Sequence, residues 1–364
     1  MHHSEITHTG IWLRENVSKL FNIARIPQKH CDNLSTPPLR PYSLSARSLL
    51  VMFHNFCYTI PVYSSQGQLA SPQCIYHRLR SVVADVDIRL KAQEVAFPIG
   101  VLSADDRNIW AKACDALWKY EKSLTHSQNL QYLLLLLLST ENKVSHEALL
   151  NSIMALSLDD FPSSYPSSTW SREELKHYHT HDRPLRMIRG TLDNFANRFY
   201  DKPFTIVVDA LTHAGATGEH SPCDALVPSI VAEYGIVQSI EEEAFQLPEG
   251  ESPTVPDGED CFTRIDWVAD DQLWSECEAA KQRSISIIMD SDDSVLWFDQ
   301  YGTDWIKGVG VHCFISSHLP FRTDIHYHSQ IFTRCLHTNG STTCLVPNSP
   351  RVHSNIRNCP DARI

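Results

Sequence analysis

The spacing of apolar residues predicts an alternation of helices and strands along the first half of the chain. Apolar residues recur at helical intervals over 11–21 and again over 74–90, so both segments are predicted to be helices. Residues 48–63 are rich in β-branched and aromatic side chains, which predicts an extended segment. Ser103 is predicted to cap a further helix, with Asp106 at the capping-box position.

The second half of the chain continues this mixture. The segment 129–139 is apolar throughout and predicts a buried element, whereas 162–181, rich in Ser, Tyr and Pro, predicts a loop. Pro, Gly and Glu dominate 246–260, which is predicted to be a linker. The remaining predicted elements are helices over 226–235 and 271–284, strands over 204–208 and 285–289, and an apolar stretch over 294–301. Mixed elements of this kind favour an α/β or α+β fold class.

Composition narrows the class of protein. The 364 residues are 42% apolar and 20% charged, which is enough for a large core and suggests about two domains. A formal net charge of -12 provides no general attraction to nucleic acid phosphates or anionic lipid. No apolar run reaches the ~20 residues of a membrane-spanning helix, and no secretory signal pattern is visible. The 11 cysteines lack CxxC spacing and predict free thiols in a reducing compartment.

The last segment of the chain, residues 311–364, differs from the rest in composition. It contains two acidic residues and five Arg, but no Lys and no Glu. It also contains four of the 11 Cys and six of the 19 His, and no helical or strand periodicity is sustained there. A disordered tail is one interpretation of this composition.

His220 is the first candidate for chemistry. It lies in a glycine-containing turn between a predicted strand and a predicted helix, with Asp224 four residues further on. A neutral imidazole in such a turn can accept a proton from a substrate hydroxyl, and Asp224 can orient the ring or order the loop. The alternative is a surface histidine beside a helix cap formed by Ser221 or Asp224. The spacing by itself leaves both interpretations open.

Other polar clusters carry weaker signals. Three alternating histidines in 177–181 suggest zinc ligands, but solvated loop side chains are the simpler interpretation. The aspartates within 290–293 lack the spacing of a calcium loop. Lys307 is either a solvated lysine or a contact to a phosphate group. No nucleophile elbow, phosphate-binding loop or dinucleotide fingerprint is present.

Five stretches, taken in order, resemble motifs of the choline/carnitine acyltransferase family, and most closely those of carnitine acetyltransferases. They are LFNIARIP at 20–27, PIGVLS at 98–103 with RNIWAKA at 107–113, MIRG at 187–190 with ANRFYDK at 196–202, EHSPCD at 219–224, and DQYG at 299–302 with IK at 306–307. Each stretch is short, but their shared order makes the resemblance specific.

The resemblance implies an α/β, chloramphenicol-acetyltransferase-like fold of two domains that meet at a catalytic histidine. The expected organisation is a His-bearing domain, a linker, the start of an incomplete second domain and an aberrant, disordered tail, at residues 1–245, 246–260, 261–310 and 311–364. The implied activity is reversible transfer of a short acyl group between coenzyme A and the hydroxyl of carnitine.

The resemblance also assigns roles to residues. His220 would be the general base, Asp224 would support it, Glu219 would line the site, and Lys307 would contact a phosphate of coenzyme A. Carnitine and acyl-CoA are the implied partners, with acetyl-CoA as co-substrate and no metal. The expected protein is a monomer without a transmembrane segment or nucleic acid partner. The family implies a mitochondrial, peroxisomal or cytoplasmic location without choosing among them.

Departures from the family pattern leave alternatives open. Ala225 stands where the family has Gly, Thr303 replaces the first lysine of the coenzyme pair, and the family's segments after Lys307 are absent. We therefore expect impaired activity. The chain would otherwise be an inactive remnant that binds coenzyme A or a partner, or an acyltransferase for choline or for longer acyl chains.

A shifted reading frame accounts for the unusual tail. Synonymous codons chosen for residues 331–364 and read one nucleotide later encode FSPDACTQMA followed by LQLAWYRTHQGFTATYETAQTHA. This sequence resembles the family segment that is missing after Lys307, in the correct order. The hypothesis is that residues 311–330 translate an intron and that the remaining tail is read out of frame.

Overall fold

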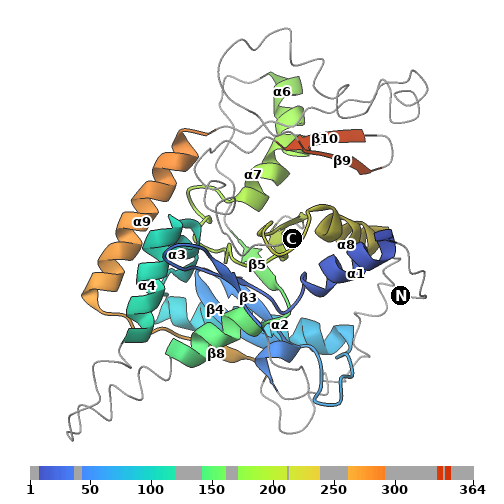
Figure 1. Cartoon of the computed structure of the whole chain (residues 1–364). Coiled ribbons are helices and arrows are strands. Elements are labelled where there is room, and N and C mark those ends of the chain that lie inside the picture. Colours follow the sequence, from blue (N-terminus) through green and yellow to red (C-terminus); the bar gives the residue numbers. More distant parts are fainter. Residues whose placement is uncertain are drawn as a thin grey trace, which may run out of the picture.

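A six-stranded mixed sheet forms the centre of the computed structural model (Figure 1). The described residues are 8–36, 43–119, 142–160, 171–210, 213–237, 261–291, 334–338 and 341–345. The strand order is β7-β6-β5-β3-β4-β8, in which β3, β5 and β6 are parallel and the other pairs are antiparallel. The strands are β3 (Ser48–Phe53), β4 (Phe56–Pro61), β5 (Ala155–Asp159), β6 (Thr205–Asp209), β7 (Ala214–Thr217) and β8 (Thr263–Ile265). The predicted mixed α/β class is confirmed.

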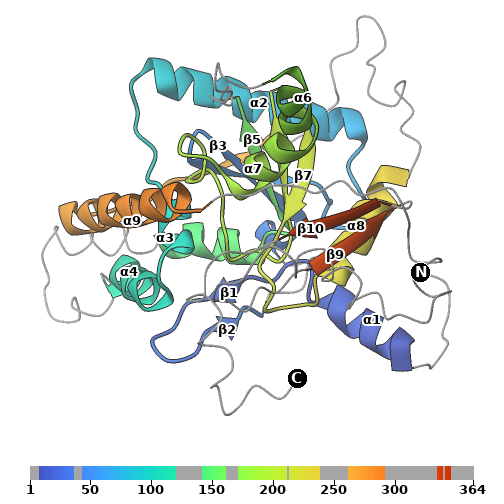
Figure 2. The ribbon, with the colours of Figure 1, turned by 90° about the horizontal axis from the view of Figure 1, so that it is seen from above.

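Helices cover both faces of the sheet, which explains why β3 and β4 are apolar on both sides. Successive side chains of a strand point to opposite faces. Leu50 and Met52 of β3 belong to the core beneath three helices, α3 (Ile99–Ala104), α4 (Arg107–Lys119) and α9 (Asp271–Met289). Val51 and Phe53 belong instead to the core beneath α2 (Pro72–Lys91), and Figure 2 shows α2 across the strands from the other three helices.

A third, smaller core supports the loop that carries His220. Leu20, Phe204, Cys223 and Val227 are buried together between α1 (His8–Ser18) and α8 (Leu226–Val237). Both figures show these two helices side by side (Figures 1 and 2). The short strands β1 (Arg25–Ile26) and β2 (Asn33–Leu34) pair antiparallel after α1.

Most predicted elements in the described residues are confirmed. The extended segment 48–63 is the β3–β4 hairpin, and 74–90 and 226–235 lie within α2 and α8. The predicted strand 204–208 corresponds to β6. The predictions for 129–139, 246–260 and 294–301 lie outside the described residues.

Ser103 is not the helix cap that its position predicted. It lies inside α3, where its hydroxyl donates to the carbonyl of Gly100 at 2.8 Å. Asp106 caps α4 instead, because its Oδ1 accepts the N–H group of Asn108 at 2.9 Å. Two short helices meet here, and the cap belongs to the second.

The predicted strand over 285–289 is also wrong, because α9 continues to Met289. Ile285 and Ile288 pack against the core while Ile287 and Met289 are exposed, which is the three-residue spacing of a helix face. The sequence Ile-Ser-Ile at 285–287 alternates apolar and polar residues as a strand does, which conceals this helical spacing.

The predicted loop over 162–181 is wrong from Ser171 onward. Ser171 and Glu174 form a reciprocal capping box, with Ser171 Oγ accepting from the Glu174 N–H at 3.2 Å. The helix α6 (Arg172–His177) follows, then a π-helical turn (Tyr178–Asp182) and α7 (Arg183–Arg189). The histidines of 177–181 therefore do not alternate along a strand.

Residues after the predicted linker pack onto the same sheet. The strand β8 pairs antiparallel with β4, so that Cys57 lies opposite Ile265, and α9 contributes Leu273 and Cys277 to the core beneath α3 and α4. In the tail, the structure describes two antiparallel strands, β9 (Arg334–Thr338) and β10 (Ser341–Leu345). The proposed division into domains stays a prediction.

Two further sequence expectations can be compared with the described residues. Six cysteines carry free thiols, but Cys31 is disulfide-bonded, so the expectation of free thiols is wrong at this residue. The absence of CxxC spacing does not exclude a bond between cysteines that are distant in the sequence. Within the described part of the chain, no helix has both the length and the apolar character needed to cross a membrane.

Candidate active site

His220 lies on the loop between β7 and α8, as the sequence predicted. Its Nδ1 atom is 3.0 Å from the carbonyl oxygen of Cys223. A carbonyl oxygen only accepts hydrogen bonds, so this contact places the proton of the neutral ring on Nδ1 and leaves the lone pair on Nε2. His220 is exposed, and Nε2 is therefore positioned as a proton acceptor on an accessible ring.

The loop lies tightly against the segment that precedes β6. A Cβ atom added at Gly218 would lie 1.9 Å from the carbonyl oxygen of Pro203. Directly after this contact, the N–H group of Glu219 donates to the carbonyl of Lys202 at 2.8 Å. Glycine is therefore required where the chain enters the loop, because any side chain would force the two backbones apart.

The carboxylate of Glu219 points back into the fold. Its Oε1 atom lies 3.1 Å from Nη1 of Arg25, a side chain that is only 4% exposed. The same oxygen accepts the N–H group of Ser221 at 3.0 Å. Glu219 therefore links the residues on both sides of His220 to strand β1.

Asp224 orders the loop where the next helix begins. Its Oδ1 accepts the N–H group of Leu226, the first residue of α8, at 2.9 Å. Its own N–H group donates to Asn16 Oδ1 on α1 at 3.3 Å. Of the two roles that the sequence left open for Asp224, these contacts support the ordering of the loop and the helix start.

A buried ion network lies beyond Arg25. The carboxylate of Asp32 lies 2.5 Å from Arg25 Nε and 2.6 Å from Arg107 Nε. Arg107 also contacts Asp201 at 2.7 Å, and Asp201 accepts the indole N–H of Trp110 at 2.7 Å. Burial raises the pKa of Asp201 to about 6, even though the positive charge of Arg107 acts in the opposite direction.

Lys202 is buried next to this network. Its Nζ donates to the carbonyls of Leu150 and Ser152, both at 2.7 Å, and to the carbonyl of Ile23 at 3.3 Å. Burial lowers the pKa of Lys202 well below its ordinary value. Lys202 therefore ties two other segments of backbone, at residue 23 and at residues 150–152, beneath the loop.

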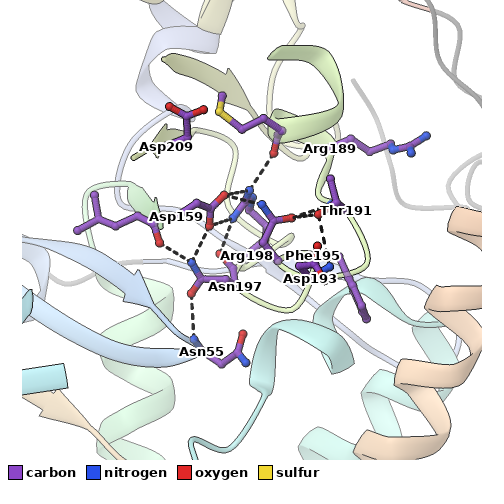
Figure 3. A network of polar contacts seen from close by, with 12 residues as sticks. Asn55, Asp159, Arg189, Thr191, Asp193, Phe195, Asn197, Arg198 and Asp209 are labelled. Carbon is purple, nitrogen blue, oxygen red and sulfur yellow. Dashed lines mark hydrogen bonds and ion pairs between the residues drawn. The ribbon is translucent and has the colours of Figure 1, made fainter. Parts of the chain in front are cut away.

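A second polar network holds the preceding segment against the end of β5 (Figure 3). The carboxylate of Asp159 accepts hydrogen bonds from both Nη groups of Arg198, at 3.0 and 2.6 Å. The side-chain amides of Asn194 and Asn197 donate to the same carboxylate at 2.8 and 3.0 Å. Asn197 Oδ1 also accepts the N–H group of Asn55 in the β3–β4 turn. Residues 194–198 are thus fixed to two strands.

Four of the five motif stretches meet at these networks. Arg25, Arg107, Arg198, Asp201 and Lys202 all come from the motifs. Glu219, from the fourth stretch, joins them through Arg25. Gly100, from the same stretch as Arg107, lies against residues 196–198, because a Cβ there would lie 2.1 Å from the carbonyl of Ala196. The fifth stretch, with Lys307, lies outside the described residues.

Sequence reasoning missed the structural partners in these networks. Arg25 and Arg107 stand in motif stretches, but their local sequence indicates no partner for either. Asp32 and Asp159 stand outside every motif, and no local pattern marks them. The arginines could have been found from one signal. A charged residue among apolar motif residues indicates a buried side chain with an oppositely charged partner, since charged groups are buried only when paired.

The fold and the loop together define a class of protein: an α/β protein with an exposed imidazole on a loop that Glu219 joins to a buried ion network. A family model described as Choline/Carnitine o-acyltransferase matches residues 3–313. The chain therefore belongs to the choline/carnitine acyltransferase family.

Named relatives differ in the acyl group and the acceptor. Carnitine O-palmitoyltransferase 2, mitochondrial, of Macaca fascicularis is 24% identical over 292 residues, which cover 79% of this chain and 36% of that protein. Choline O-acetyltransferase of Danio rerio is 23% identical, covering 80% and 40%. Carnitine O-acetyltransferase of Columba livia is 24% identical, covering 71% and 35%. The chain thus spans well under half the length of these relatives.

Proposed function

We propose that this protein transfers an acyl group between coenzyme A and the hydroxyl of carnitine, with His220 as the general base. The observation that carries the proposal is the contact between His220 Nδ1 and the Cys223 carbonyl, because it leaves Nε2 as the proton acceptor. Membership of the choline/carnitine acyltransferase family supports the reaction class.

In the proposed mechanism, Nε2 of His220 takes the hydroxyl proton while the oxygen attacks the carbonyl carbon of the thioester. A tetrahedral intermediate forms and collapses when the carbon–sulfur bond breaks. The imidazolium then returns the proton to the departing thiolate, and the products are free coenzyme A and the acyl ester. In the reverse direction, the same nitrogen takes the proton of the thiol. No acyl-enzyme is formed.

We propose further that the six-stranded sheet belongs to one of two chloramphenicol-acetyltransferase-like domains. The chain covers 36% of the macaque relative, and the family match ends at residue 313, close to the start of the unusual tail. Lys307 would contact a phosphate of coenzyme A. Thr303 stands where the family has the first lysine of the coenzyme pair, so we expect weak binding of coenzyme A and slow turnover.

The acyl group and the acceptor remain part of the proposal. A short acyl group and carnitine follow from the resemblance in the motifs. The palmitoyltransferase and choline acetyltransferase relatives match at similar identity, so a longer acyl group and choline are tested alongside the acetyl group and carnitine.

The experiment measures release of the coenzyme A thiol from acetyl-CoA or palmitoyl-CoA, each with carnitine or choline. The expected result is slow turnover with acetyl-CoA and carnitine that His220→Gln abolishes. The matched control is His179→Gln, since His179 is also exposed but lies far along the chain in the π-helical turn. Turnover that survives His220→Gln contradicts the proposal. Calorimetric binding of coenzyme A without any turnover identifies a binding remnant instead.

A further inference from the structure

We infer that Arg25 is a positioning residue for His220 and that it acts through the carboxylate of Glu219. This inference rests on the proposed function of His220 and deepens it. Arg25 lies on β1 and Glu219 lies on the loop after β7, so the ion pair joins two elements that are distant in the sequence.

The side chain of Arg25 is buried between two carboxylates. Its side chain is 4% exposed, its Nε lies 2.5 Å from Asp32, and its Nη1 lies 3.1 Å from Glu219. Its backbone N–H group donates to the carbonyl of Asp201 at 2.9 Å. A guanidinium presents separate nitrogens to two carboxylates at once, whereas an ammonium is a single point charge.

Glu219 connects this ion pair to the backbone on both sides of the histidine. Its N–H group is bound to the Lys202 carbonyl on one side of His220, and its Oε1 receives the Ser221 N–H group on the other side. The ring is then bound through Nδ1 to Cys223 in the same loop. If the Glu219 carboxylate moves, the backbone on which the ring contact depends moves with it.

The first test is a double-mutant cycle on turnover, with Arg25→Gln, Glu219→Gln and the double variant. Each single change is expected to lower kcat roughly 10- to 100-fold with little change in KM, because the base is misplaced rather than removed. The double variant should be no slower than the slower single variant, since both changes break one interaction. Arg25→Lys should recover part of the loss. If the loss in kcat of the double variant equals the product of the two single losses, the residues act independently and the inference is wrong.

The matched control is Arg283→Gln. Arg283 also forms an arginine–carboxylate pair, with Asp105 at 2.6 Å, but this pair joins α9 to the end of α3 rather than to the loop. Its loss should leave kcat unchanged. A reduction in kcat equal to that of Arg25→Gln would show that breaking any such pair slows the enzyme, and would overturn the inference.

The second test does not depend on turnover. Nitrogen-15 NMR of labelled histidine distinguishes a proton on Nδ1 from one on Nε2, and His220→Gln assigns the signal. The wild-type signal should report the Nδ1–H form, and Arg25→Gln and Glu219→Gln should each shift the population toward Nε2–H. Glu219→Gln is nearly isosteric and retains an acceptor for Ser221, so it serves if Arg25→Gln fails to fold. If the tautomer is unchanged in the folded variants, the inference is wrong. If the tautomer shifts but the protein shows no turnover, only the proposed function is contradicted.

Discussion

Arg198 and Asp159 form a bidentate ion pair in which both side chains are only 1% exposed. The pair joins the end of β5 to a segment 39 residues further along the chain. A charged group at this depth is tolerated only with its partner present, because water no longer stabilises it.

Replacing Asp159 with Ala should therefore lower the free energy of unfolding by about 3–5 kcal/mol, since the guanidinium of Arg198 is left buried without its carboxylate. Urea unfolding measures the change. The neighbouring Asp160 provides the control, because it pairs with His54 at 2.9 Å while 49% of its side chain is exposed. Asp160→Ala should cost at most ~1 kcal/mol. Equal losses in the two variants would contradict the importance of burial here.

Lys202→Met should destabilise the protein by about 3 kcal/mol, because three buried carbonyls lose their donor while the apolar volume is kept. The same unfolding measurement applies. Lys281→Met is the control, since Lys281 is exposed on α9 and its replacement should change stability by less than ~0.5 kcal/mol. A stable Lys202→Met variant would mean that the carbonyls of Leu150 and Ser152 find other donors.

Gly218→Ala should displace the His220 loop, because the added methyl group would overlap the Pro203 carbonyl. We expect a loss of about 1–3 kcal/mol in stability and a change in the His220 NMR signals. Gly235→Ala is the contrasting change, since nothing lies within 4 Å of its added Cβ and it stands inside helix α8. That variant should gain up to ~1 kcal/mol from helix propensity. Unperturbed His220 signals in Gly218→Ala would show that the loop tolerates the overlap.

His146 should make the protein less stable in acid. Burial lowers the pKa of His146 from 6.5 to about 4, whereas the unfolded chain keeps the ordinary value. Between these pH values the unfolded state binds more protons than the folded state. The contribution of neutral His146 to folding stability is therefore complete above about pH 6.5 and is lost as the pH falls toward 4. The loss amounts to roughly 3 kcal/mol. Unfolding followed across this pH range should show a slope that His146→Gln removes, and an identical slope in both proteins would exclude His146 as its source.

The tail should prove to be a shifted reading frame. Sequencing the transcript across codons 305–335 should reveal an intron within the region of residues 311–330, followed by a frame that encodes FSPDACTQMA after its removal. A continuous transcript whose shifted frame encodes a different sequence would exclude this explanation.

The sequence by itself determined the mixed α/β class, the family, and the turn that carries His220. These features depend on local spacing or on short motifs in a fixed order, and both are properties of neighbouring residues. The same dependence explains the errors. The alternation Ile-Ser-Ile at 285–287 imitates a strand inside a helix, and the polar composition around Ser171 concealed a capping box.

Only the tertiary structure decided what holds the histidine loop. Glu219, which the family resemblance placed at the lining of the site, has its carboxylate paired with Arg25, and Arg107 meets Asp201 across 94 residues of sequence. The partner of a buried charged side chain is determined by which groups the fold brings within contact distance. No local pattern encodes that choice, because the partners become neighbours only when the sheet and its helices are assembled.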